Sequence, residues 1–136
     1  MADSPLLTKS KAFALDIIRV CNEIKRSQKE SILTNQLVRS GTSIGANIRE
    51  AFYAHSKADF ISKLQIALKE CSESEYWLEL LIESNYYSDK TILDRCNQYF
   101  LNLNASIEYA FITIITAFDQ QFQPVLTFGA FLQRNL

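Results

Sequence analysis

The sequence predicts an all-α protein, an antiparallel up-down-up-down four-helix bundle. Its 136 residues include only three glycines and two prolines, less turn material than an all-β fold requires. Four stretches repeat apolar residues at helical spacing, and the short turns between them favour antiparallel neighbours. With 48% hydrophobic residues, the chain is expected to form one bundle domain over residues 1–120, followed by an apolar tail over residues 121–136.

The first helix is expected over about residues 6–27. Ser4 and Pro5 form a start signal, because proline is tolerated in the first turn of a helix. The apolar residues that then recur at helical spacing are Ala14, Ile17, Cys21 and Ile24. The polar run KRSQKE interrupts this pattern and indicates a solvated turn.

The second helix, about residues 31–54, contains two glycines within the stretch RSGTSIGANIREA. Each glycine costs a helix roughly 1 kcal/mol relative to alanine, so the stretch is either an anion-binding loop or a helix with a close neighbour. The apolar register continues through Gly41 and Gly45, and the lysine and strand of a phosphate-binding P-loop are missing. We therefore expect these glycines to allow close helix packing, with Asn47 hydrogen-bonded across the interface between helices.

The third helix is expected over about residues 56–85, and the fourth over about residues 89–119. SKAD at residues 56–59 resembles a capping box, and Ser88-Asp89 is a second candidate cap. The core residues expected in the third helix are Phe60, Leu64, Leu68, Cys71, Leu78 and Ile82. Those expected in the fourth helix are Leu93, Cys96, Phe100, Leu103, Ile107, Ala110, Ile114 and Ala117.

The residues give no sign of a catalytic or metal centre, so we expect a non-enzymatic protein without cofactor, metal or small-molecule substrate. The only histidine, His55, has no thiol or carboxylate at a pairing distance in sequence. Five glutamates between residues 70 and 83 lack the Glu-x-x-His motif of bundle metal sites. The three cysteines are expected to be buried, reduced thiols. Without a signal peptide or an apolar run near ~20 residues, a cytoplasmic location without membrane contact is expected.

Two outward-facing stripes are candidate interaction surfaces. Ile66, Trp77 and Leu80 point away from the expected core of the third helix, because residues 11 and 14 apart nearly eclipse. Large exposed apolar patches are unusual on monomers, so this stripe is a candidate oligomer interface, with scattered surface residues as the alternative. The second helix carries a polar stripe formed by Arg39, Thr42, Ala46, Arg49 and Tyr53. It could contact phosphate and stack on a base, or it could be a solvated or intersubunit face.

The net charge of −1 conceals an asymmetry along the chain. Residues 1–69 contain 11 Lys or Arg against 6 Asp or Glu, whereas residues 70–136 contain 3 against 9. An antiparallel bundle would bring five cations to one end: Lys9, Lys11, Arg49, Lys57 and Lys63. Such an end suits an anionic partner, although the chain as a whole lacks the charge of a strongly basic nucleic-acid binder.

The segments QLVRSGTSIGANIREA and SKADFISKLQIALKECSESEYWLELL resemble the four-helix-bundle family encoded within intervening sequences of bacterial 23S ribosomal RNA genes. The likeness covers about residues 10–115. Members of that family form up-down bundles that assemble as pentamers, so the resemblance implies a homo-oligomer. The accessory variability determinant of diversity-generating retroelements, which is similar in fold, binds a reverse transcriptase and nucleic acid. By this resemblance, the candidate RNA contacts are Arg39, Arg49, Lys57 and Lys63.

The sequence and the resemblance together favour a non-enzymatic, homo-oligomeric bundle that binds RNA or a ribonucleoprotein weakly. The alternative is a scaffold that docks another protein and does not bind nucleic acid. That alternative rests on the stripe of Ile66, Trp77 and Leu80 and on the apolar tail.

Overall fold

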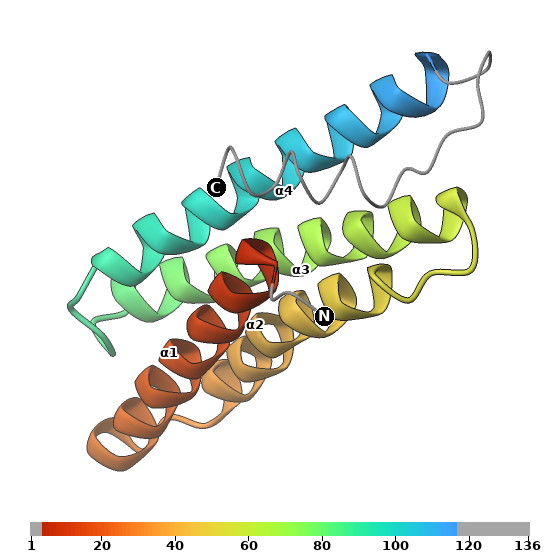
Figure 1. Cartoon of the computed structure of the whole chain (residues 1–136). Coiled ribbons are helices and arrows are strands. Elements are labelled where there is room, and N and C mark those ends of the chain that lie inside the picture. Colours follow the sequence, from red (N-terminus) through yellow and green to blue (C-terminus); the bar gives the residue numbers. More distant parts are fainter. Residues whose placement is uncertain (1–3, 117–136) are drawn as a thin grey trace.

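A computed structural model describes residues 4–116 and shows four helices (Figure 1). They are α1 (Pro5–Gln28), α2 (Ile32–Ala51), α3 (Lys57–Glu83) and α4 (Thr91–Thr116). Residues 4–116 contain no strand, and the predicted all-α class is confirmed. The described helix ends lie within three residues of those expected. The expected domain end at residue 120 and the tail over residues 121–136 lie outside the described residues.

Side-chain hydrogen bonds fix where α3 and α4 begin. Ser56 Oγ accepts a hydrogen bond from the Asp59 N–H (3.1 Å), and the Asp59 carboxylate accepts one from the His55 N–H (3.3 Å). This arrangement is close to a capping box, with aspartate in the position usual for glutamate. Asp89 Oδ1 accepts hydrogen bonds from the N–H and the hydroxyl of Thr91 (2.9 and 2.7 Å). Both caps therefore satisfy backbone donors that a helix start would otherwise leave unpaired.

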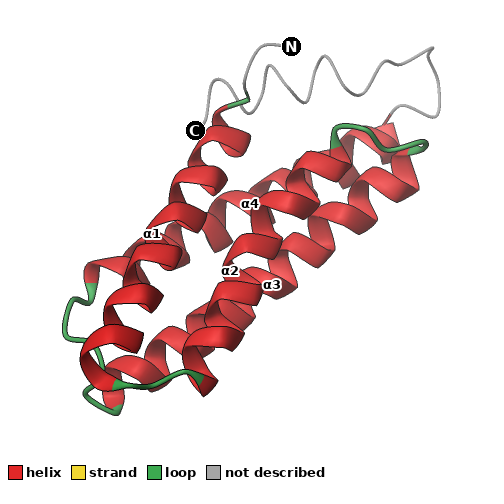
Figure 2. Cartoon of the chain, turned by 90° about the horizontal axis from the view of Figure 1, so that it is seen from below, coloured by secondary structure: helices red, strands yellow, loops and turns green. Residues whose placement is uncertain are grey.

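Contacts between the helices show that sequence neighbours run antiparallel. Ser10 lies against Gly45, whereas Cys21, farther along α1, donates to the Thr34 carbonyl nearer the start of α2 (3.5 Å). The pairs between α2 and α3 follow the same order: Ser40 with Ser74, and Glu50 with Lys63. Both ribbon views agree, and the turn between α2 and α3 lies at the same end of the molecule as the end of α4 (Figures 1 and 2).

The first half of α4 closes the bundle against α1. The rings of Phe13 and Tyr99 lie 5.0 Å apart between centroids, and the Tyr99 hydroxyl donates to the Lys9 carbonyl. On the surface beside them, Asp16 forms an ion pair with Arg95 at 2.5 Å. The contact between α1 and α4 therefore combines a buried aromatic pair with an ion pair at its rim.

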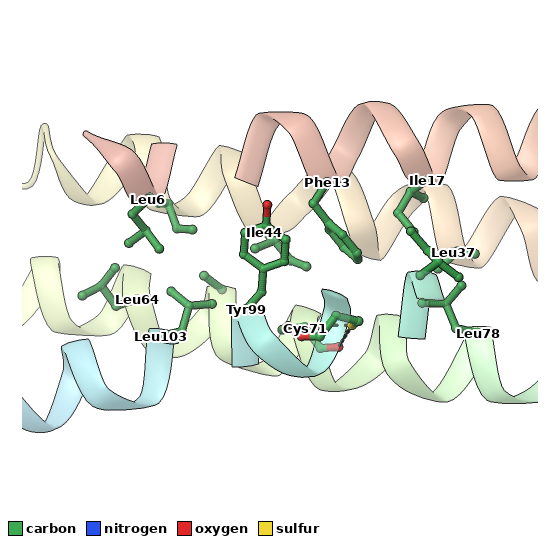
Figure 3. Close-up of a cluster of buried hydrophobic side chains, with 14 of the residues drawn as sticks. Leu6, Phe13, Ile17, Leu37, Ile44, Leu64, Cys71, Leu78, Tyr99 and Leu103 are labelled. Carbon is green, nitrogen blue, oxygen red and sulfur yellow. Dashed lines mark hydrogen bonds between the residues drawn. The ribbon is translucent and has the colours of Figure 1, made fainter. Parts of the chain in front are cut away.

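The core runs the length of the bundle between all four helices (Figure 3). Its largest fully buried side chains include Phe13, Ile17, Leu37, Ile44, Leu64, Leu78 and Leu103. Most predicted core residues of α1 and α2 are buried. Ala14 and Leu33 are only half-buried.

The buried faces of α3 and α4 differ from those expected. In α3, Ile61, Ala67 and Leu81 are buried, whereas the expected core residues Phe60, Leu68 and Ile82 are half-buried. In α4, Ile92 and Tyr99 are buried, whereas the expected Leu93 and Phe100 are half-buried. The reason is that α3 packs against α2 on one side and α4 on the other, so its buried arc is wider than a single apolar stripe. The side chains at positions 110, 114 and 117 lie outside the described set.

Candidate nucleic-acid interface

The helix α2 is continuous through the glycine-containing stretch, and both glycines face α1. A methyl group on Gly41 would lie 3.0 and 3.1 Å from the γ carbons of Ile17, a fully buried side chain. A methyl group on Gly45 would lie 3.2 Å from Ser10 Oγ. No glycine within residues 4–116 has a positive φ. The stretch is thus a helix surface onto which α1 packs closely, and it forms no loop around an anion.

Asn47 makes its hydrogen bonds inside α2, so the prediction of a bond across the helix interface is wrong. Its Nδ2 donates to the carbonyl oxygen and to Oγ of Ser43 (2.9 and 3.1 Å). The carbonyl four residues earlier is always within reach of a short polar side chain on a helix. That local acceptor satisfies the half-buried amide without any contribution from a neighbouring helix.

Arg39, a candidate RNA contact, is bound to carboxylates of α3. Its guanidinium forms an ion pair and hydrogen bond with Glu73, and its second nitrogen lies 3.6 Å from Glu70 Oε2. The Trp77 indole N–H donates to Glu73 at 3.1 Å. The hydrogen bonds from Arg39 and then Trp77 hold the pKa of Glu73 below its usual value. Burial raises the pKa of Glu70. The buried oxygen, Glu70 Oε2, has no hydrogen-bond partner among the described residues, since Arg39 lies beyond hydrogen-bond distance.

Lys63 is likewise paired, whereas Lys57 and Arg49 are exposed. Lys63 Nζ lies 2.7 Å from Glu50 Oε2, and this hydrogen bond raises the pKa of Lys63. Lys57 is the first residue of α3 and is exposed. Arg49, in the last turn of α2, is exposed and has no hydrogen bond or ion pair within residues 4–116. The four candidate cations therefore differ in how readily a phosphate could reach them.

The surface where α1 and α2 meet adds two residues to Arg49. Lys11 follows Ser10, which contacts Gly45, so Lys11 lies about one helical turn from the level of Arg49. Lys11 is exposed and has no ion pair with any described carboxylate. Tyr53 comes four residues after Arg49, and its side chain is 63% exposed. We call Lys11, Arg49 and Tyr53 the α1–α2 end surface.

The apolar stripe of α3 is more buried than its spacing predicts. Ile66 is 36% exposed, and Trp77 and Leu80 are half-buried. Trp77 packs against the core residues and its ring lies 5.0 Å from that of Tyr76, which is 52% exposed. Ile32, at the start of α2, is 77% exposed. Because α3 contacts α2 over a broad face, residues that periodicity places opposite the core are still partly covered by the neighbouring helix.

The buried cysteines have the properties of inert thiols. Burial raises the pKa of Cys21 to about 12, and the hydrogen bond between Cys96 and Cys71, followed by burial, raises the pKa of Cys96. Protonated thiols are poor nucleophiles and poor metal ligands. Within residues 4–116, no group of three His, Cys, Asp or Glu side chains is arranged to hold a metal ion. None of the described helices combines the length and hydropathy of a membrane span.

A comparison against protein families agrees with the fold. Residues 3–104 match the family described as 23S rRNA-intervening sequence protein. The chain belongs to this family. The match covers α1 to α3 and the first half of α4, including every candidate RNA contact.

A solved structure supports membership of the 23S rRNA-intervening sequence family. It is the crystal structure of a protein of unknown function from the S23 ribosomal protein family of Bacteroides thetaiotaomicron. The two chains are 45% identical, with a TM-score of 0.74, and the similarity covers 76% of this chain and 98% of the other. No curated protein matches the chain.

Sequence reasoning missed Lys11 as part of a surface with Tyr53, although it placed Lys11 at this end of the bundle. It also missed that Arg39 and Lys63 are paired, because the partners Glu73 and Glu50 lie on another helix. An available signal was the antiparallel register, which brings the end of α2 beside the start of α3. Reading both helices together could have indicated the pair of Glu50 and Lys63.

Proposed function

We propose that this protein is a non-enzymatic RNA-binding accessory factor that assembles with copies of itself and contacts RNA weakly through the α1–α2 end surface. The observation that carries the proposal is Arg49, an exposed cation without a carboxylate partner among the described residues, within a positively charged part of the bundle. Residues 4–56 contain eight Lys or Arg against four Asp or Glu, whereas residues 57–116 contain five against nine. The chain belongs to the family described as 23S rRNA-intervening sequence protein, which favours an RNA partner and, with it, a cytoplasmic location.

Among the four candidate cations, Arg49 supports the proposal best. A phosphate approaching Arg39 or Lys63 would have to displace Glu73 or Glu50 from an existing ion pair. That exchange returns little free energy, because one charge-assisted contact replaces another. We therefore place the principal phosphate contact at Arg49.

Fluorescence anisotropy with a labelled structured RNA, at about 50 and about 200 mM salt, tests the proposal. We expect weak binding that falls with salt, because each phosphate contact releases counterions. Arg49→Gln should weaken binding and flatten the salt dependence. Arg39→Gln is the matched control, since the same charge is removed from a paired position on the same helix. Binding that ignores salt, or equal effects of both variants, would contradict the assigned contact.

For self-association, we propose Ile66, Trp77 and Leu80 as part of the interface. Trp77 is a poor position for a test, because it packs against the core and bonds to Glu73. Ile66→Glu changes an outer position, 36% exposed, and should lower the assembled mass measured by light scattering toward 15.6 kDa. Leu101→Glu on α4, where the side chain is 61% exposed, is the control. A pentamer, as implied by the family resemblance, would have five times the chain mass.

A second candidate function is a scaffold that docks another protein and does not bind nucleic acid. The exposed ring of Tyr76, which packs beside the half-buried Trp77, favours it. Exposed aromatic side chains of this kind are typical of protein interfaces. Pull-down from lysate with and without nuclease separates the two functions. A partner that persists after nuclease treatment and is lost in Tyr76→Glu would favour the scaffold.

A further inference from the structure

Tyr53 is the exposed aromatic side chain of the α1–α2 end surface. Its side chain is 63% exposed, and no hydrogen bond or ring contact holds it within residues 4–116. Tyr76, which is also more than half exposed, differs because its ring packs beside Trp77. The ring of Tyr53 therefore presents a face on which another flat group could stack.

The charges around Tyr53 suit an anion. Arg49 precedes it by four residues and lies in the last turn of α2, which ends two residues before Tyr53. The adjacent carboxylate, Glu50, is 2.7 Å from Lys63 and is thereby neutralised. Lys11 extends the positive surface onto α1 and has no carboxylate partner among the described residues. An exposed aromatic ring that follows an exposed arginine, unpaired among the described residues, at the end of α2 combines the two features that bind single-stranded nucleic acid.

We infer that this surface binds an unpaired nucleotide of RNA, with its base stacked on Tyr53 and its phosphate in contact with Arg49. The inference rests on the proposed function and narrows the partner to a single-stranded segment. Bases inside a duplex have both faces covered by their neighbours, whereas a loop or a strand end leaves a face open. Stacking of this kind tolerates any base, because every base has a flat face.

The test compares a labelled RNA single strand of about 12 nucleotides with a duplex of the same length, by fluorescence anisotropy at low salt. Wild-type protein should bind the single strand more tightly. Tyr53→Ala should weaken binding to the single strand by about 5- to 150-fold, the value of one base stacked on an aromatic ring. Tyr53→Phe should retain most of the affinity, since it keeps the ring. Tyr76→Ala is the matched control and should leave the affinity unchanged.

The outcomes separate this inference from the proposed function. If duplex and single strand bind equally and Tyr53→Ala has no effect, the stacking site is refuted while RNA binding through Arg49 stands. An equal loss in Tyr53→Ala and Tyr53→Phe would assign the effect to the hydroxyl and also refute stacking. If wild-type protein binds neither RNA, the proposed function fails and the inference fails with it. Circular dichroism of each variant confirms that the helices are intact.

Discussion

Replacing Gly41 by alanine should destabilise the bundle, whereas the same change at Gly45 should not. Both substitutions gain about 1 kcal/mol of helix propensity. At Gly41 the new methyl group would lie 3.0 and 3.1 Å from the γ carbons of Ile17, well inside the 3.5–4.0 Å of an ordinary carbon contact. Ile17 is fully buried, so it has little room to move. Overpacking of this kind costs about 1–3 kcal/mol, which leaves a net loss near 1 kcal/mol.

At Gly45 the tightest contact is with the hydroxyl oxygen of Ser10, at 3.2 Å, and the next contacts are ordinary at 3.5 and 3.6 Å. A hydroxyl group can rotate away at the cost of its hydrogen bond to the Leu7 carbonyl. That bond is worth about 1 kcal/mol at most, so the gain in helix propensity offsets it. Gly45→Ala should therefore lie within about 0.5 kcal/mol of wild type, and it serves as the matched control for Gly41→Ala.

Urea unfolding followed by circular dichroism measures this difference. With a slope of about 1–3 kcal/mol per molar urea, a gap of about 1 kcal/mol moves the midpoint by roughly 0.3–1 M. All variants must be compared at one protein concentration, because self-association would stabilise the folded chain by mass action. In an Ile17→Ala background the two γ carbons are absent and the tightest remaining contact is with Cβ of residue 17 at 3.3 Å, so Gly41→Ala should cost less than in the wild-type background. If Gly41→Ala is as stable as Gly45→Ala, or costs the same in both backgrounds, the close-packing argument is wrong.

Three further predictions concern buried or paired groups. Incubation of the folded protein with glutathione disulfide should leave Cys71 and Cys96 reduced, although their sulfur atoms lie 3.9 Å apart, because both side chains are fully buried and the raised pKa of Cys96 disfavours the thiolate that the exchange requires. Mass spectrometry should show the loss of two hydrogens only when urea has unfolded the chain. Ser74→Ala should lower the free energy of unfolding, measured in urea, by about 1 kcal/mol, because the Ser74 hydroxyl donates a buried hydrogen bond to Ser40. The double variant with Ser40→Ala should lose less free energy of unfolding than the sum of the two single changes. Glu73→Gln should lower the melting temperature at neutral pH. The difference from wild type should fade as the pH falls through the folded pKa of Glu73, which lies below its usual value. A carboxyl group with a lowered pKa stabilises the fold only while it is ionised.

Helix positions were predictable because their signals are local. Pro5, Ser56 and Asp89 each act within a few residues of a helix start, so the sequence alone is enough to recognise them. The helical conformation of the stretch around Gly41 was predictable for a similar reason, since the apolar register on both sides of it continues. These properties depend on neighbours in the chain and need no knowledge of the partner helix.

Side-chain partners were not predictable in this way, because they depend on which faces oppose each other. Asn47 had a choice between a local carbonyl and a neighbouring helix, and only the coordinates show that the local acceptor is used. Arg39 and Lys63 looked like exposed cations because their acidic partners, Glu73 and Glu50, are 34 and 13 residues away in the chain. If the buried face of a helix is predicted one residue out of place, a residue of such a pair is wrongly assigned to the solvent or to the core.

The ion pairs between α2 and α3 lie where the two oppositely charged parts of the bundle meet. Arg39 of the positive part, residues 4–56, pairs there with Glu73 of the negative part, residues 57–116, whereas Lys63 and Glu50 pair in the opposite sense. Cations on the other side of α2, such as Arg49, have no such partner among the described residues. The proposed RNA contact and the apolar positions of α3 therefore occupy different surfaces. Arg49 and Ile66 share no described partner, so their substitutions should act independently. Arg49→Gln should weaken RNA binding without changing the assembled mass. Ile66→Glu should lower the assembled mass, and the salt dependence of RNA binding should stay as in wild type.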